Sequence, residues 1–112
     1  MPTSNPALTM MATQTQVLTQ GVPATLTLPV DPLGVVHGVG ATGLISPSHA
    51  LIGVEGNAVR WGLNPSATNG IVVPAGGQVS FMDANIEYRG TLRQVQFVSL
   101  NGPATLQIQF FN

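Results

Sequence analysis

The sequence contains no cysteine and no lysine, and its only strong bases are Arg60, Arg89 and Arg93. Without cysteine, the chain forms no disulfide, offers no thiolate to a metal and has no cysteine nucleophile. Three arginines do not make the clustered positive surface that neutralises phosphates, so we expect no nucleic-acid partner. No run approaches the roughly 20 apolar residues of a membrane span, and the N-terminal stretch lacks the basic and apolar regions of a signal peptide. We therefore expect a soluble, intracellular chain with no membrane partner.

Charge of either sign is scarce, since 6% of the residues are charged while 44% are hydrophobic. At 112 residues, the chain is long enough for one hydrophobic core, and a single domain is the default expectation. Its surface must consist largely of uncharged polar residues, so little charge repulsion keeps copies apart. We therefore expect a surface largely covered by partners, and a homo-oligomer such as a dimer or trimer.

Hydrophobic residues recur with a period of two, most clearly near the C-terminal end. Leu106, Ile108 and Phe110 alternate with polar residues, which places the two kinds of side chain on opposite faces of a strand. Glycine and proline are too densely scattered for a long helix. Further short strands are predicted at residues 25–30, 50–54, 57–63, 71–73, 78–82 and 92–100.

Turn residues separate these runs. The segment Pro74–Gly77 divides two of them, and Asn101-Gly102 has the residues of a tight type I′ turn. We therefore expect residues 92–100 and 104–111 to pair as a hairpin. The whole pattern predicts an all-β domain over residues 13–112. It is a single antiparallel β-sandwich of seven or eight short strands, jelly-roll-like, with a barrel as the second choice.

Residues 1–12 lack the strand pattern and are predicted to form an extended N-terminal arm. Such an arm has no hydrophobic face of its own, so we expect its apolar groups to contact a neighbouring chain. Tyr88, between two charged residues, and Phe111, at the chain's end, are further candidates for an interface. The predicted protein–protein contacts are Pro6, Leu8, Met10, Met11, Tyr88 and Phe111.

Two motifs resemble ligand sites but lack the context that these sites need. The segment Gly38–Gly43 matches the dinucleotide-binding pattern GxGxxG, yet Pro47 would break the helix that must begin inside it. We interpret the segment as a glycine-rich loop. His37 and His49 have no second histidine or carboxylate at metal-ligand spacing. We therefore predict no cofactor and no metal site.

Catalytic constellations are equally incomplete. Ser48 and His49 are adjacent, but neighbours in sequence seldom point at each other, and no nucleophile-elbow sequence surrounds the serine. The acidic residues, Glu55 among them, are expected to pair with arginines such as Arg60 instead of forming a glycosidase pair. Trp61 is in phase with the apolar residues of its strand, so we expect it in the core and not in a sugar-stacking platform. We predict no catalytic residue and no enzymatic activity.

The second half of the chain carries an ordered set of motifs. A strand with an arginine and an aromatic residue is followed by a proline-containing loop, an apolar strand leading into PAGG, and a last strand ending in paired aromatics. The segments are Ala58–Gly62, Asn64–Gly70, Val73–Gly77, Phe97-Val98, Gly102–Leu106 and Phe110-Phe111. In this order they resemble a recurring family of small structural proteins encoded by tailed bacteriophages, over about half of the chain.

The resemblance implies a virion protein of β-sandwich type, assembled in the host cytoplasm. Its implied role is that of a capsid cement or decoration protein, which binds the major capsid protein or other virion proteins and stabilises the assembled head shell. Two alternatives stay open: a head–tail or tail accessory protein of the virion, and a sugar-binding adhesin module. A sandwich fold is common to all three, so the fold alone does not choose between them.

Overall fold

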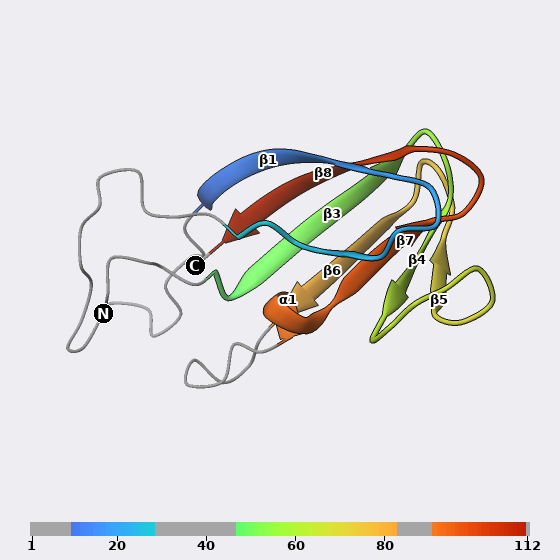
Figure 1. Cartoon of the computed structure of the whole chain (residues 1–112). Coiled ribbons are helices and arrows are strands. Elements are labelled where there is room, and N and C mark those ends of the chain that lie inside the picture. Colours follow the sequence, from blue (N-terminus) through green and yellow to red (C-terminus); the bar gives the residue numbers. More distant parts are fainter. Residues whose placement is uncertain (1–9, 29–46, 83–90, 112) are drawn as a thin grey trace, which may run out of the picture.

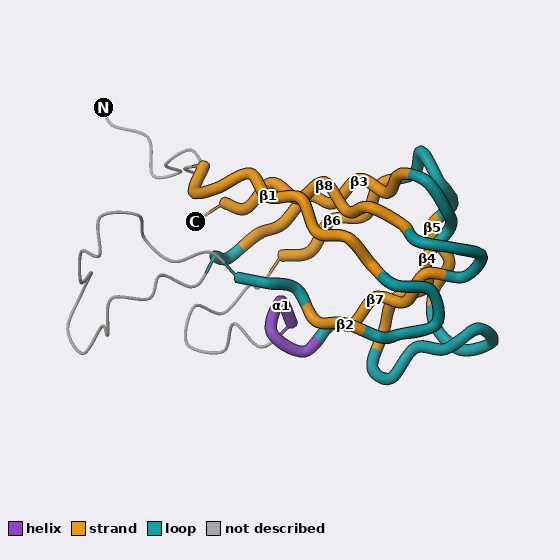
Figure 2. The backbone as a smooth tube through the Cα atoms, turned by 45° about the horizontal axis from the view of Figure 1, so that its top comes forward, coloured by secondary structure: helices purple, strands orange, loops and turns teal. Residues whose placement is uncertain are grey.

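Two four-stranded antiparallel sheets pack face to face in a computed structural model, which describes residues 10–28, 47–82 and 91–111 (Figures 1 and 2). The first sheet has the order β1-β8-β3-β6, and the second has the order β2-β7-β4-β5. A short helix, α1 (Thr91–Gln94), precedes β7. The strands are β1 (Met10–Leu18), β2 (Ala24–Thr25), β3 (His49–Glu55), β4 (Val59–Gly62), β5 (Ile71–Val73), β6 (Gln78–Met82), β7 (Gln96–Ser99) and β8 (Ala104–Phe111).

The strand order is that of a jelly roll. The first strand pairs with the last, β2 pairs with β7, β3 with β6, and β4 with β5, all antiparallel. A chain folded back on itself once and then wrapped around a core produces this nesting, with alternate pairs in opposite sheets. The predicted antiparallel, jelly-roll-like β-sandwich is therefore confirmed.

The core fills the space between the sheets, where the period-two pattern directs every second side chain. Phe97 and Phe110 are fully buried, from the second and first sheet respectively. Phe81 stands edge-on to Phe97, with ring centroids 6.1 Å apart, and edge-on to Trp61 at 4.9 Å. Trp61 is partly buried and packs against this core, as its phase in the sequence predicted.

The predicted hairpin between residues 92–100 and 104–111 is wrong. Strand β7 pairs with β2 and β4, whereas β8 pairs with β1 and β3, so the two consecutive strands lie in different sheets. The connection also differs from a type I′ turn, because only Gly102 of the two central residues has a positive φ. Asn57 holds this connection by donating a hydrogen bond of 2.7 Å from Nδ2 to the carbonyl of Pro103.

Some apolar residues of the predicted strands are buried although they do not lie in a strand. Of the run predicted at 25–30 the structure describes residues 25–28, in which only Thr25 belongs to a strand, yet Leu26 is buried and Leu28 packs against the core. The run predicted at 92–100 begins with helix α1, whose Leu92 is also buried. Within residues 10–28, 47–82 and 91–111, no helix is long and apolar enough to cross a membrane.

Strand β1 has no counterpart among the runs predicted from alternation. It begins at Met10, so the last three residues of the expected arm belong to the sheet. Its inner side is held by an amide: Gln16 Nε2 donates to the carbonyl of Thr25 at 2.8 Å, and Gln16 Oε1 accepts from the Thr27 N–H at 3.1 Å. This side chain joins the two sheets through hydrogen bonds, which explains why the strand lacks an apolar stripe.

Candidate functional site

The outer face of sheet β1-β8-β3-β6 is composed mainly of threonine and glutamine. The register places Thr13, Gln109, Leu51 and Ser80 in one row across the four strands. The next row runs through Thr15, Gln107, Gly53 and Gln78. We name this surface the Thr/Gln face and define it by Thr13, Thr15, Leu51, Gly53, Glu55, Gln78, Ser80, Gln107 and Gln109.

Cross-strand hydrogen bonds fix the two β8 glutamines on this face. Thr13 donates to Oε1 of Gln109, while Gln109 Nε2 donates to the carbonyls of Ala12 at 3.0 Å and Phe110 at 3.1 Å. Thr15 donates to Oε1 of Gln107 at 2.9 Å. Both ends of the Gln109 amide are therefore occupied. The Nε2 group of Gln107 has no partner among the described residues, so its donors face solvent.

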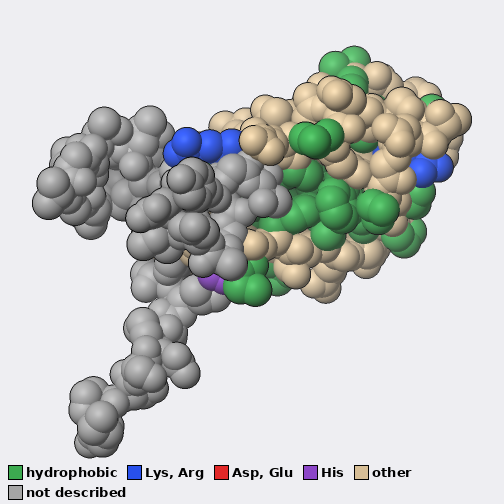
Figure 3. All heavy atoms as spheres, turned by 90° about the horizontal axis from the view of Figure 1, so that it is seen from below, with side chains coloured by type: hydrophobic (Ala, Val, Ile, Leu, Met, Phe, Trp, Pro, Cys, Tyr) green, Lys and Arg blue, Asp and Glu red, His purple; other side chains and the backbone are tan. Residues whose placement is uncertain are grey.

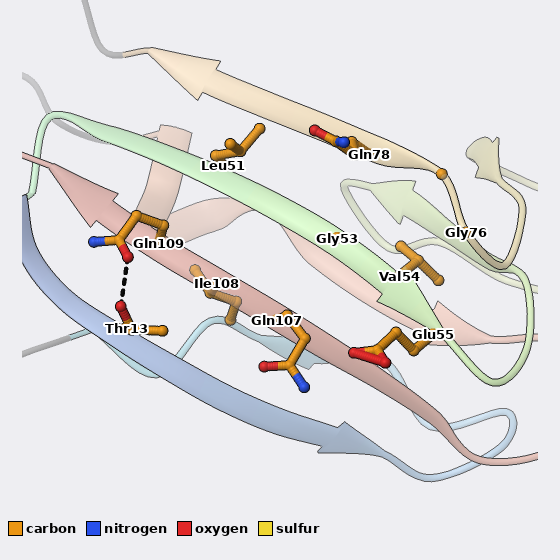
Figure 4. A pocket seen from close by; sticks show the side chains of 11 residues that line it. Thr13, Leu51, Gly53, Val54, Glu55, Gly76, Gln78, Gln107, Ile108 and Gln109 are labelled. Carbon is orange, nitrogen blue, oxygen red and sulfur yellow. Dashed lines mark hydrogen bonds between the residues drawn. The ribbon is translucent and has the colours of Figure 1, made fainter.

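A hollow of about 380 Å³ opens in the middle of the Thr/Gln face (Figure 4). The turn between β5 and β6 closes one end of the hollow. Backbone hydrogen bonds connect this turn to β3. Val54 N–H donates to the Gly77 carbonyl at 3.0 Å, and Gly76 N–H donates to the Val54 carbonyl at 2.7 Å. The lining residues are Thr13, Leu51, Gly53, Val54, Glu55, Gly76, Gly77, Gln78, Gln107, Ile108 and Gln109.

Gly53 leaves this hollow open without being required by the backbone. The turn glycines are different: Gly76 has a φ of +86°, and a Cβ on Gly77 would lie 2.9 Å from the Pro74 carbonyl oxygen. Gly53 has no left-handed φ, and among the described residues a Cβ there would meet only the Gln107 carbonyl oxygen, at 3.9 Å. A glycine inside a strand costs about 0.5–1 kcal/mol relative to alanine. The backbone conformation therefore does not require a glycine at this position. A glycine here does keep the hollow open, because it places no side chain in it.

One end of the same sheet face is apolar. Met10 is paired with Phe111, which is paired with His49 and through it with Met82. Met10 and Met82 are 64% and 67% exposed. The structure thus brings together two of the predicted contact residues, Met10 and Phe111.

The structure says less about the other four predicted contact residues. Met11 follows Met10 in β1. Pro6, Leu8 and Tyr88 lie outside the described residues. Their role in contacts stays a prediction.

The loop after β4 covers part of the outer face of the second sheet, although Val72, in register with Arg60 on this face, is 46% exposed. Arg60, on β4, donates from Nε to the Ala67 carbonyl at 3.1 Å and from Nη1 to the Gly70 carbonyl at 2.9 Å. We expected Arg60 to form an ion pair with a carboxylate. Among the described residues its guanidinium instead donates to backbone carbonyls, because the loop after β4 folds back over it. Pro65 in this loop is buried. The two sheets thus differ: one outer face carries a loop, and the described residues place no such loop on the other.

Ser48 and His49 do point at each other, contrary to the expectation from sequence. Ser48 Oγ lies 2.7 Å from His49 Nδ1. The one acid that the structure describes, Glu55, is at the opposite end of β3, six residues and about 20 Å away along the strand. In the described ranges, no group of three metal-ligating side chains occurs. His37, the segment Gly38–Gly43 and the remaining acids lie outside them.

Apolar side chains also gather at one side of the domain (Figure 3). Leu63 and Ile71 are 68% and 57% exposed near the edge of the second sheet. A pocket of about 170 Å³ lies beside them, lined by Trp61, Phe81 and Val95 among others. The buried indole Nε1 of Trp61 has no hydrogen-bond partner among the described residues.

The chain matches no protein-family model, no curated protein and no solved structure with which it was compared. The Thr/Gln face was not predicted as a site. Its one signal in the sequence is Gly53, an isolated glycine inside the run His49–Glu55 that otherwise alternates between the two faces. The partners that form the hollow come from strands far along the chain, and the sequence gives no indication of which strands these are.

Proposed function

We propose that this protein is a non-enzymatic structural subunit of a phage virion, acting as a cement or decoration protein on the capsid shell. The observation that carries the proposal is the contrast between the two outer faces of the sandwich. One face is partly covered by the chain's own loop, held by Arg60. The other is an open sheet face with very little charge and an apolar end formed by Met10, Phe111 and Met82.

Such a face suits association with another protein. Fully buried centres of protein interfaces are depleted in charged residues and enriched in methionine and aromatic residues. The side chains of Gln109 and Gln107 are already fixed before a partner binds, because Thr13 and Thr15 donate hydrogen bonds to them. Holding side chains in place beforehand lowers the entropy cost of binding.

The resemblance of residues 58–111 to small structural proteins of tailed phages supports the virion as the setting. The mechanism would be thermodynamic. A protein that binds only the assembled shell stabilises it by mass action, in proportion to occupancy and affinity. The low charge of the chain also supports a symmetric dimer or trimer as the unit that binds.

Two substitutions test the face. Met10→Glu and Met82→Glu each place a charge in the apolar end, so we expect binding to purified shells to weaken at least about tenfold, or about 1.4 kcal/mol. Val22→Glu, at a residue 53% exposed in the connection after β1, is the matched control and should bind normally. All three variants should keep the wild-type melting temperature, because each site is exposed. Normal shell binding by both methionine variants would contradict the proposal.

The number of copies per virion separates the shell from the other virion locations. Quantitative gels of purified particles should give hundreds of copies for a cement protein. About a dozen or fewer copies would indicate the neck or the tail instead.

A further inference from the structure

We infer that the hollow at Gly53 is a binding site for a neutral saccharide. This inference does not depend on the proposed virion role, because it concerns a small ligand at the centre of the Thr/Gln face and not the apolar end of the sheet. It starts from the shape of the site: the missing side chain at Gly53 produces a hollow that the backbone does not need.

The polar groups around the hollow match hydroxyl groups. Thr15 occupies Oε1 of Gln107 and thereby orients its Nε2 donors, which have no partner in the described part of the chain. The side chains of Gln78, on the opposite side of Gly53, and of Glu55 also make no hydrogen bond with described residues. Together they offer donors and acceptors on both sides of the hollow (Figure 4). A sugar hydroxyl both donates and accepts, so it can use an amide and a carboxylate at the same time.

The apolar and charged groups define the ligand further. Leu51 is 42% exposed at the rim and can cover the C–H face of a sugar ring. The lining residues that the structure describes include no cation, so an anionic ligand would find no counter-charge. Glu55 is their only acidic residue and would oppose any anion. The chemistry therefore favours an uncharged, polyhydroxylated ligand.

An extended peptide is a poorer match to the same hollow. Peptides commonly bind sheets by adding a strand at a free edge. The floor of this hollow is made by β3 and β8, each of which is already hydrogen-bonded to a strand on both sides. A peptide here could use only side-chain contacts, whereas a sugar needs no backbone pairing.

The test is an NMR titration of the ¹⁵N-labelled full chain with D-glucose, D-galactose, N-acetyl-D-glucosamine and cellobiose. Each sugar is added to about 50 mM, because a few hydrogen bonds on an open face support dissociation constants of about 1 mM. We expect at least one sugar to produce saturable shifts in the Gly53 amide and in the side-chain NH₂ groups of Gln107 and Gln78. Absence of saturable shifts at these groups for all four sugars would overturn the inference.

Gly53→Val separates binding from folding. The valine side chain fills the hollow, so binding should weaken at least about tenfold, while the melting temperature should stay equal or rise because valine favours strands. Ser80→Val is the matched control, since it adds the same side chain to the neighbouring strand outside the hollow. Binding by Gly53→Val at the wild-type level would overturn the inference. A lowered melting temperature for Gly53→Val would overturn it as well, because the fold would then require the glycine.

The outcomes also remain distinct from those for the virion role. Shell binding that depends on Met82 without any sugar binding would leave the proposed function standing and remove the saccharide site. Sugar binding lost in Gly53→Val, together with unchanged shell binding by the methionine variants, would do the reverse.

Discussion

Arg60 allows a strict test of how the second sheet is covered. Its guanidinium donates to the carbonyls of Ala67 and Gly70, at 3.1 and 2.9 Å. A hydrogen bond from a charged donor contributes about 1.5–3 kcal/mol, but the bond to Ala67 is exposed and its carbonyl can be rehydrated. For Arg60→Met, which keeps the apolar stem, we therefore expect the free energy of unfolding to fall by about 2–3 kcal/mol. In a domain of roughly 100 residues this lowers the melting temperature by about 8–24 °C.

Urea denaturation measures the loss of stability, and hydrogen exchange followed by mass spectrometry measures the opening of residues 63–70. Arg60→Lys should be intermediate, because an ammonium group cannot reproduce the forked geometry that reaches two carbonyls. The difference between wild type and Arg60→Met should persist in about 1 M NaCl, where the Debye length is about 3 Å. A difference that disappears in salt would indicate an acidic partner instead. Unchanged stability and exchange in Arg60→Met would refute the idea that this side chain holds the loop.

Two further substitutions test the core and the link between the sheets. Phe97→Ala removes a fully buried ring that contacts Phe81, so it should cost about 3–5 kcal/mol by urea denaturation, and a loss below about 1 kcal/mol would contradict its central place. Gln16→Ala removes both hydrogen bonds between β1 and the segment around β2, so it should cost about 1–2 kcal/mol and accelerate amide exchange at Thr27. Unchanged exchange at Thr27 would show that this bridge does not hold the segment.

Strands with an apolar inner face were predictable because alternation is a property of neighbouring residues. In β8, Leu106, Ile108 and Phe110 are all buried, as their spacing indicated. Val59 and Phe81, in the runs predicted at 57–63 and 78–82, are buried as well. Strand β1 was not predicted, because Gln16 contacts the opposite sheet through hydrogen bonds of its amide and not through an apolar side chain. Its assignment to a sheet depends on its partner β8, which is more than 80 residues away in the sequence.

The partners of two polar side-chain groups were not predictable from general tendencies. Ser48 and His49 were expected to point apart, yet their side chains lie 2.7 Å from each other. Arg60 was expected to find a carboxylate, and the fold offered it carbonyls of its own following loop. In both cases the sequence names the groups, while the path of the backbone determines which of them meet.

The sequence by itself determined that the chain is an antiparallel β-sandwich with little charge, because composition and the period of two are local properties. Only the tertiary structure decided which strands share a sheet. The expected hairpin of β7 and β8 was divided between the two sheets, because β7 pairs with β2 and β4 while β8 pairs with β1 and β3, and most of these partners are distant in the sequence. The same pairing brings Gln107 and Gln78 to either side of Gly53. The hollow on the Thr/Gln face therefore exists only in the folded chain, where a single missing side chain is surrounded by residues distant in sequence.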